Sequence, residues 1–107
     1  MLRRLLPFFA FLVLPFTASA AAPAPLKALI LTGQNNHDWK LTTPLLEKAL
    51  TDTGLFTVDI VTSPPKGGDM STFRPAFSDY AVVISNYTGD AWPAETKSAF
   101  VAYVRNG

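Results

Sequence analysis

The sequence predicts an α/β fold in which helices cover a parallel sheet on both faces. Two observations support this fold class. Three short apolar runs of the kind found in buried parallel strands occur from Leu26 onward, and segments of helical periodicity follow the first and the last of them. This alternation is typical of the first half of a doubly wound sheet. Because crossovers between parallel strands are right-handed, we expect the strand order 2-1-3.

The three predicted strands differ in character. Residues 26–31 form an apolar run that stops at Thr32-Gly33. Phe56–Val61 alternates, with Asp59 facing solvent, as an edge strand does. Tyr80–Ser85 has the most buried character of the three. An apolar strand at the sheet edge invites aggregation, so we expect a further strand, encoded beyond residue 107, to pair with it.

The first predicted helix carries an apolar stripe: Leu41, Leu45, Leu46, Ala49 and Leu50. Thr42 or Thr43 is the expected cap, with Pro44 in the first turn, where its missing N–H costs nothing. If Asp38 were the cap instead, Pro44 would lie inside the helix and distort it. A short extra turn over residues 38–41 remains an alternative.

A second helix is predicted over Pro93–Arg105. Asp90 is the expected cap, and Glu95 suits the first turn. Its predicted apolar stripe consists of Trp92, Phe100, Tyr103 and Val104. One further helical turn is predicted around Met70–Phe73, within the crossover between the second and third strands.

Residues 1–20 have the layout of a cleaved secretory signal peptide. Arg3 and Arg4 precede the apolar core Leu5–Phe16, and small residues in an A-x-A pattern end at Ala20. The alternative is a membrane anchor, but the apolar core is shorter than the roughly 20 residues that span a bilayer. We therefore expect export to the periplasm or the medium, with no stable membrane insertion after cleavage. Residues 21–25 read as a stiff linker, and residues 26–107 as the domain.

Charge and composition exclude several kinds of partner. The chain has nine Lys and Arg against eight Asp and Glu; without Arg3 and Arg4 it has seven against eight. This leaves no basic face for nucleic acid. No cysteine is present, and the single histidine argues against a metal site. No phosphate-cradling glycine motif follows the first strand, so we expect no cofactor.

The candidate site lies where two polar loops follow the first and third strands. In a 2-1-3 order the chain reverses its direction of winding between these strands, and a crevice opens at their carboxyl ends. The loops span Gly33–Trp39 and Asn86–Trp92. Their amides, hydroxyls and aromatic faces suit a polyhydroxylated ligand. The candidate residues are His37 as a catalytic group and Asn36, Asp38, Trp39, Asn86 and Tyr87 as ligand-binding groups.

Structural roles compete with each of these assignments. Asp38 is equally well explained as a helix cap. Trp39 and Trp92 are more often packing residues over the ends of a sheet. His37 can instead orient the loop backbone. The sequence leaves both kinds of role open for these residues.

The chain also resembles a known family. The segment KALILTGQNNHDWKLTTPLLEKAL, the strand FTVDIVTSP and the segment YAVVISNYTGDAWPAETKSAFVAYVRNG are similar to the trehalose-utilisation (ThuA-like) family. The most specific part is Asn36-His37-Asp38-Trp39. The resemblance implies a flavodoxin-like, class I glutamine amidotransferase-like three-layer sandwich, of which this chain forms the N-terminal part. It also implies a link to trehalose, related disaccharides or their keto derivatives.

The expected function is therefore the binding or processing of a small carbohydrate. His37 would be the acid–base group, since histidine side chains titrate near neutral pH. The alternative is a non-catalytic interaction module beside a sugar-processing enzyme, and a flavin or nucleotide binder is a third reading. Whether the protein is an enzyme, and its oligomeric state, are left open by the sequence.

Overall fold

A computed structural model describes residues 12–107 and contains three strands and two α-helices. In chain order they are β1 (Leu26–Thr32), α1 (Trp39–Thr51), β2 (Phe56–Thr62), β3 (Val82–Ser85) and α2 (Ala94–Asn106). All strand pairs are parallel, and the sheet order is β2-β1-β3. The predicted α/β class and strand order 2-1-3 are confirmed, and the arrangement corresponds to part of a flavodoxin-like fold.

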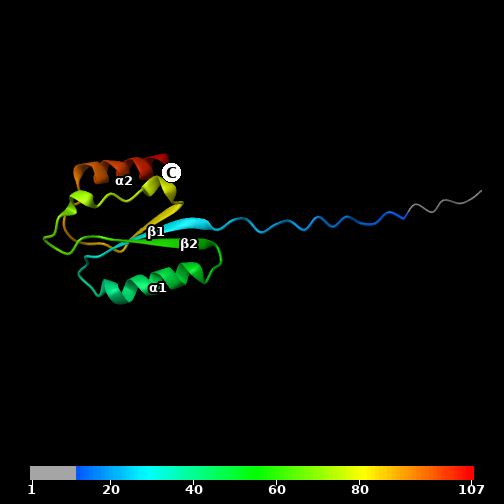
Figure 1. Cartoon of the computed structure of the whole chain (residues 1–107), viewed down its shortest axis with the longest axis horizontal. Coiled ribbons are helices and arrows are strands. Elements are labelled where there is room, and N and C mark those ends of the chain that lie inside the picture. The colour runs from blue at the N-terminus through cyan, green and yellow to red at the C-terminus, as the bar shows by residue number, and fades with distance from the viewer. Residues whose placement is uncertain (1–11) are drawn as a thin grey trace, which may run out of the picture.

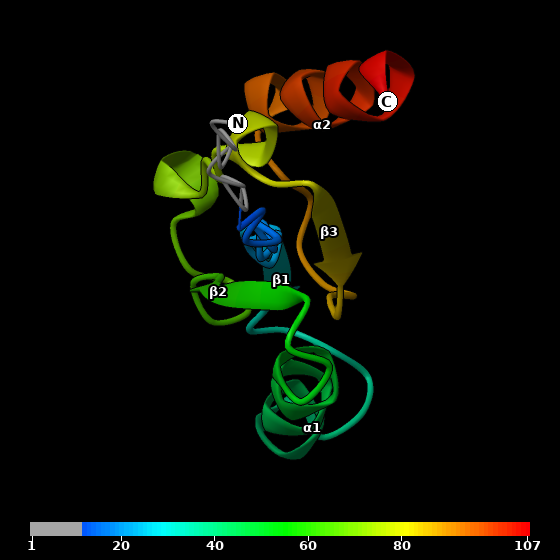
Figure 2. The ribbon, with the colours of Figure 1, turned by 90° about the vertical axis from the view of Figure 1, so that its right-hand side faces the viewer.

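The elements form three layers. Figure 2 shows the sheet between α1 on one side and α2 on the other. The crossover from β2 to β3 lies on the α2 side and contains two 3-10 turns, Met70–Thr72 and Phe77–Asp79. The first turn was predicted from the sequence, and the second was not. Figure 1 shows residues 12–25 running away from these layers as an extended, exposed segment.

The centre of the core is β1. Ala28 to Leu31 have no exposed surface, because β1 has a neighbouring strand on each side and helices over both faces. Leu29 and Leu31 pack on the α2 side against Phe73 and Phe77. The prediction that the third strand is the most buried was wrong. Its residues 82–84 are only half-buried, since β3 pairs with β1 alone among the described residues.

The start of α1 differs from the prediction. Its N-cap is Asp38, whose Oδ1 accepts a hydrogen bond from the Leu41 amide at 3.2 Å. Pro44 consequently lies inside the helix, and the preferred cap at Thr42 or Thr43 was wrong. The reason is tertiary. Thr43 is buried and hydrogen-bonds across to β1, so its hydroxyl stabilises packing rather than the helix end.

The face that α1 presents to the sheet is rotated from the predicted stripe. Leu41 and Leu45 are 62% and 59% exposed, whereas Thr43 is buried and Leu46 and Leu50 are half-buried. The predicted stripe is therefore correct only in part.

An aromatic cluster fixes α2 to the crossover. The ring centroid of Phe77 lies 5.2 Å from that of Phe100 and 6.3 Å from that of Tyr103, both on α2. The ring centroid of Trp92 lies 6.1 Å from that of Phe77. Val104 does not join them and is 61% exposed, contrary to the predicted stripe.

The cap predicted for α2 was also wrong. The helix begins after Pro93, without a capping side chain, and its first residue is Ala94. Asp90 lies further back in the loop, where it bonds to other loops.

The predicted signal peptide lies partly outside the described residues. Residues 1–11 are not described, and residues 12–25 form no helix or strand. Within residues 12–107, no helix combines the length and the apolar character needed to cross a membrane.

Candidate functional site

A groove of about 660 Å³ lies at the carboxyl ends of the strands. Its walls come from the loops that follow β1, β2 and β3, as expected for the switch point between β1 and β3. The lining residues are Gly33, Gln34, Asn35, Asn36, Trp39, Pro65, Lys66, Thr88, Gly89 and Asp90.

Gly33 lets the chain turn sharply as it leaves β1. Its φ is +118°, a conformation that side chains with a Cβ rarely adopt. A Cβ at this position would also lie 2.6 Å from the backbone nitrogen of Ser63. The amide of Ser63 in turn donates to the carbonyl of Thr32 at 2.8 Å. The loops after β1 and β2 are therefore in direct contact at the base of the groove.

Gln34 joins all three loops. Its side chain is buried; Nε2 donates to the carbonyl of Pro64 at 2.8 Å, and Oε1 accepts from the amide of Asp90 at 2.9 Å. The Gln34 carbonyl accepts from the amide of Thr88 at 2.9 Å. One residue thus holds the loop after β1 to the loops after β2 and β3, and fixes the width of the groove.

Asp90 completes this connection from the opposite side. Its Oδ2 accepts from the Gly67 amide at 2.6 Å and from Gln34 Nε2 at 3.4 Å. The neighbouring Gly89 lies directly on Gln34, so that a Cβ there would collide with the Gln34 side chain. The groove is therefore built from close, mutually bonded loops.

Asn86, a predicted ligand-binding residue, is directed into the protein. It is buried, and its Nδ2 donates to the hydroxyls of Thr42 and Thr43 at 3.1 and 3.0 Å. Its Oδ1 accepts from Asn35 Nδ2 at 3.4 Å. Thr43 Oγ1 is in turn 2.7 Å from Thr32 Oγ1. This polar network supports the floor beneath the groove, and Asn86 does not line the groove itself.

Tyr87 also supports the loop from below. Its hydroxyl donates to the backbone carbonyl of Asp90 at 2.6 Å, and its ring lies 6.1 Å from Phe73 and 5.8 Å from Trp92. Burial, followed by the negative charge of Asp90, raises the pKa of Tyr87 above its ordinary value. The ring is part of the aromatic cluster and does not line the groove.

The four candidates in the first loop separate into two pairs. Asn36 and Trp39 line the groove; Asn36 is exposed and Trp39 is half-buried. His37 is exposed and is not among the lining residues. Asp38 caps α1. Trp92 packs in the aromatic cluster, as its structural role predicted, whereas Trp39 lines the groove.

Several lining residues were not among the sequence candidates. Gln34, Asn35, Thr88 and Asp90 belong to the two polar loops but were not chosen as site residues, and Lys66 lies in the loop after β2. The signal that identifies Lys66 is its place after β2: three neighbouring parallel strands bring three loops to one edge of the sheet, not two.

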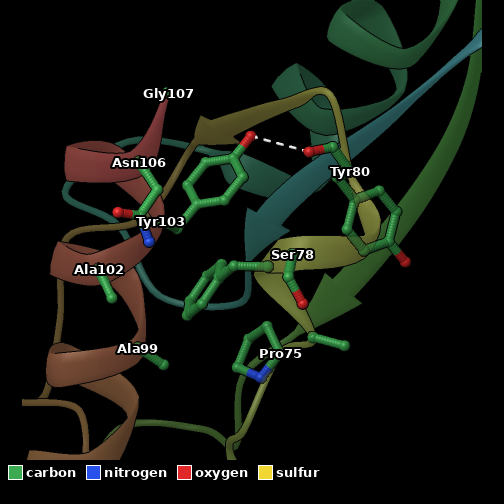
Figure 3. A pocket seen from close by; sticks show the side chains of 10 residues that line it. Pro75, Ser78, Tyr80, Ala99, Ala102, Tyr103, Asn106 and Gly107 are labelled. Atoms are coloured by element: carbon green, nitrogen blue, oxygen red, sulfur yellow. Dashed lines mark hydrogen bonds between the residues drawn. The ribbon is translucent and has the colours of Figure 1, made fainter.

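A second cavity of about 460 Å³ lies between the second 3-10 turn and α2. Figure 3 shows Tyr80, Ala99 and Tyr103 around it, with the hydroxyl of Tyr103 donating to the carbonyl of Tyr80 at 3.0 Å. Because Tyr80 precedes β3, this cavity lies toward the amino ends of the strands. Its described lining contains no acidic, basic or histidine side chain, so we place the candidate site at the groove.

Residues 12–107 contain no group of three or more His, Asp or Glu side chains arranged to hold an ion.

The structure is similar to the crystal structure, at 1.75 Å resolution, of a ThuA-like protein from Parabacteroides merdae ATCC 43184. The two share 48% sequence identity with a TM-score of 0.77, over 78% of this chain. The match covers 30% of the Parabacteroides chain, so the present chain spans less than a third of that relative's length. No protein-family model matches the sequence, and a search of curated proteins finds no match.

Proposed function

We propose, on the premise that this chain belongs to the ThuA-like family, that it binds a carbohydrate in the groove at the carboxyl ends of β1 and β3. The observation that carries the proposal is the chemistry of the groove lining. Two residues with side-chain amides, Asn35 and Asn36, border one hollow together with the hydroxyl-bearing Thr88 and the aromatic Trp39.

These groups match what a sugar offers. Amides and hydroxyls both donate and accept hydrogen bonds, so they can pair with hydroxyls of either orientation. The indole face of Trp39 provides an apolar surface for the C–H face of a sugar ring. The groove is also large enough for a disaccharide, since ligand pockets are commonly about 300 to 1,000 Å³ in volume.

The groove is built before a ligand arrives. Gln34 and Asp90 bond the three loops to one another, and Asn86 anchors Asn35 from below. A binding site whose walls are already ordered loses less conformational freedom on binding, which favours affinity. This order supports a binding role for the groove.

Isothermal titration of the purified protein with α,α-trehalose and related disaccharides tests the proposal. We expect Trp39→Ala to weaken binding at least tenfold, because a ring face worth about 1.5 kcal/mol or more is lost. Trp39→Phe is the matched control and should retain most of the affinity. A folded wild-type protein that binds none of these sugars would overturn the proposal.

Turnover is a separate question from binding. His37 adjoins Asn36 along the chain but does not line the groove, and this observation favours the second candidate function, a non-catalytic binding module. Incubation with a bound disaccharide, followed by NMR, distinguishes the two. Product formation that His37→Ala abolishes, at unchanged affinity, assigns His37 the acid–base role. Binding without product supports the module.

Export belongs to the same proposal. Arg3 and Arg4, the apolar run that follows them and the small residues ending at Ala20 support cleavage of a signal peptide after Ala20. Mass spectrometry of the protein recovered from outside the cytoplasm should give a mature N-terminus at Ala21. Recovery of only the uncleaved protein, inside the cytoplasm, would contradict export.

A further inference from the structure

We infer that Asp90 determines the specificity of the groove, by accepting hydrogen bonds from the hydroxyls of a neutral sugar and by disfavouring anionic sugars such as phosphate esters. This inference rests on the proposed carbohydrate function and names the class of ligand. It begins from an asymmetry between the two carboxylate oxygens of Asp90.

One oxygen is committed to the protein. Oδ2 accepts from the Gly67 amide and from Gln34 Nε2, while the backbone amide of Asp90 donates to Gln34 Oε1. The Asp90 carbonyl accepts from the hydroxyl of Tyr87. These four hydrogen bonds reach Asp90 from three different segments and hold both its backbone and its carboxylate in place.

The other oxygen is left for a ligand. Oδ1 accepts no hydrogen bond from residues 12–107, although Asp90 lines the groove. Within the same range Asp90 forms no ion pair with a Lys, Arg or His side chain. A carboxylate oxygen accepts hydrogen bonds and cannot donate them, and bonds to a charged acceptor are stronger than bonds between neutral groups. Hydroxyl donors therefore suit Oδ1, whereas a phosphate or carboxylate would be repelled.

Lys66 also lines the groove and would favour an anion. Lys66 is exposed, and its ammonium group lies at the end of a flexible side chain. Water therefore screens this charge, and its contribution to the binding of an anion is small. Asp90 is half-buried and held by hydrogen bonds, so its charge is fixed in the groove. The fixed carboxylate therefore outweighs the mobile ammonium group in selecting the ligand.

Asp90→Asn is the informative variant. The asparagine oxygen can still accept from Gly67 and Gln34, and these two donors keep the NH2 group on the side of Oδ1. The substitution thus preserves the loop contacts but replaces the unbonded acceptor Oδ1 by a donor. Asp79→Asn, which removes one carboxylate charge at an exposed position outside the groove, is the matched control. Thermal unfolding of each variant verifies that the fold is unchanged.

Titration with α,α-trehalose and with trehalose 6-phosphate provides the readout. We expect the wild-type protein to bind the neutral sugar at least tenfold more tightly than the phosphate ester. Asp90→Asn should lose about tenfold to a hundredfold in affinity for the neutral sugar. The preference of this variant for the neutral sugar over the phosphate ester should therefore be smaller than that of the wild type. Asp79→Asn should change either affinity less than about threefold, because an exposed charge away from the groove is screened by water.

Three results would overturn the inference. If Asp90→Asn binds trehalose as tightly as the wild type, or if the wild type prefers the phosphate ester, Asp90 does not set specificity, although carbohydrate binding stands. If the folded wild type binds neither sugar, the proposed function fails as well, and the inference fails with it.

Discussion

The hydroxyl oxygens of Thr32 and Thr43 lie 2.7 Å apart in the interior, where they join the last residue of β1 to the first half of α1. Asn86 Nδ2 donates to the same Thr43 hydroxyl at 3.0 Å. One buried oxygen therefore connects a strand, a helix and the loop after β3. This connection holds α1 against the sheet directly below the groove.

Replacing Thr43 by Val should destabilise the fold by about 1 to 3 kcal/mol, because a buried hydroxyl and amide lose their partner while the side-chain volume is unchanged. Urea unfolding followed by circular dichroism measures the loss. Thr57→Val, at an exposed position of β2, is the control and should change stability by less than about 0.5 kcal/mol. Equal effects at the two positions would contradict the role given to Thr43.

Asp38→Ala should cost about 1 kcal/mol, because the Leu41 amide at the start of α1 loses its acceptor. Asp38→Asn retains an acceptor oxygen and should restore most of the stability. Because Asp38 does not line the groove, both variants should bind sugar as the wild type does. A large loss of affinity in the stable Asn variant would return Asp38 to the list of ligand-binding residues.

Gly89→Ala should narrow the groove. The added methyl group would collide with the buried Gln34 side chain, which cannot move without breaking its bonds to Pro64 and Asp90. We expect a cost of about 1 to 3 kcal/mol together with weaker sugar binding.

The control for Gly89→Ala is Gly54→Ala. Gly54 has φ +70° and open space around it, so the substitution strains the backbone by about 1 to 2 kcal/mol without touching the groove. Loss of stability with unchanged affinity at Gly54, and loss of both at Gly89, is the expected pattern. Full affinity in Gly89→Ala would show that the contact with Gln34 does not shape the site.

Alkaline pH should destabilise the protein in part through Tyr87. Burial, then the charge of Asp90, raise the pKa of Tyr87 above its ordinary value of 10.0 in the folded state. The unfolded chain therefore loses the phenolic proton first, and stability falls as the pH rises from about 10 through the folded pKa. Denaturant unfolding between about pH 9 and pH 11 should show a shallower fall in Tyr87→Phe than in the wild type.

Tyr80 provides a comparison for this measurement. A hydrogen bond to Asp59 is the main cause that raises its pKa, and its hydroxyl lies at the surface of the sheet, away from the groove. Tyr80→Phe should also make the fall in stability between about pH 9 and pH 11 shallower, but it should leave the affinity for sugar unchanged. If neither substitution alters the fall in stability at alkaline pH, neither tyrosine is its source.

The sequence was sufficient to predict the sheet. The apolar run from Leu26 to Leu31 marks a strand buried on both faces, and Asp59 marks an edge strand. Right-handed crossovers whose two connections cover opposite faces of the sheet give the order 2-1-3, and the structure has that order. These features follow from local pattern and chain connectivity, which the sequence states directly.

The contacts between loops could not be predicted in the same way. Asp90 satisfies the sequence rule for a helix cap, but it bonds to Gly67, which is 23 residues away, and to Gln34, which is 56 residues away. An aspartate near a helix start and an aspartate between loops look alike in sequence. Only the placement of the three loops at one edge of the sheet separates the two roles.

The face of α1 illustrates the same limit. Five apolar residues predicted its buried side, but the sheet lies nearer to Thr43 than to Leu41 or Leu45. An analysis of hydrophobic periodicity treats threonine as polar and therefore as exposed. The burial of Thr43 is favourable because its hydroxyl has a partner on β1, and this partner is set by the tertiary structure. The rotation of the helix was therefore invisible in the pattern.

The hydrogen bonds of Gln34 show that no single segment of the chain forms the groove. Its walls are contributed by residues as far apart as Gly33 and Asp90, and the bonds that join them run between loops rather than within one. Isolated peptides covering a single loop should consequently show no affinity for sugar. A saturating sugar should in turn protect residues 26–107 as a unit from protease digestion, since it is recognised only by molecules in which β1, β2 and β3 are already side by side.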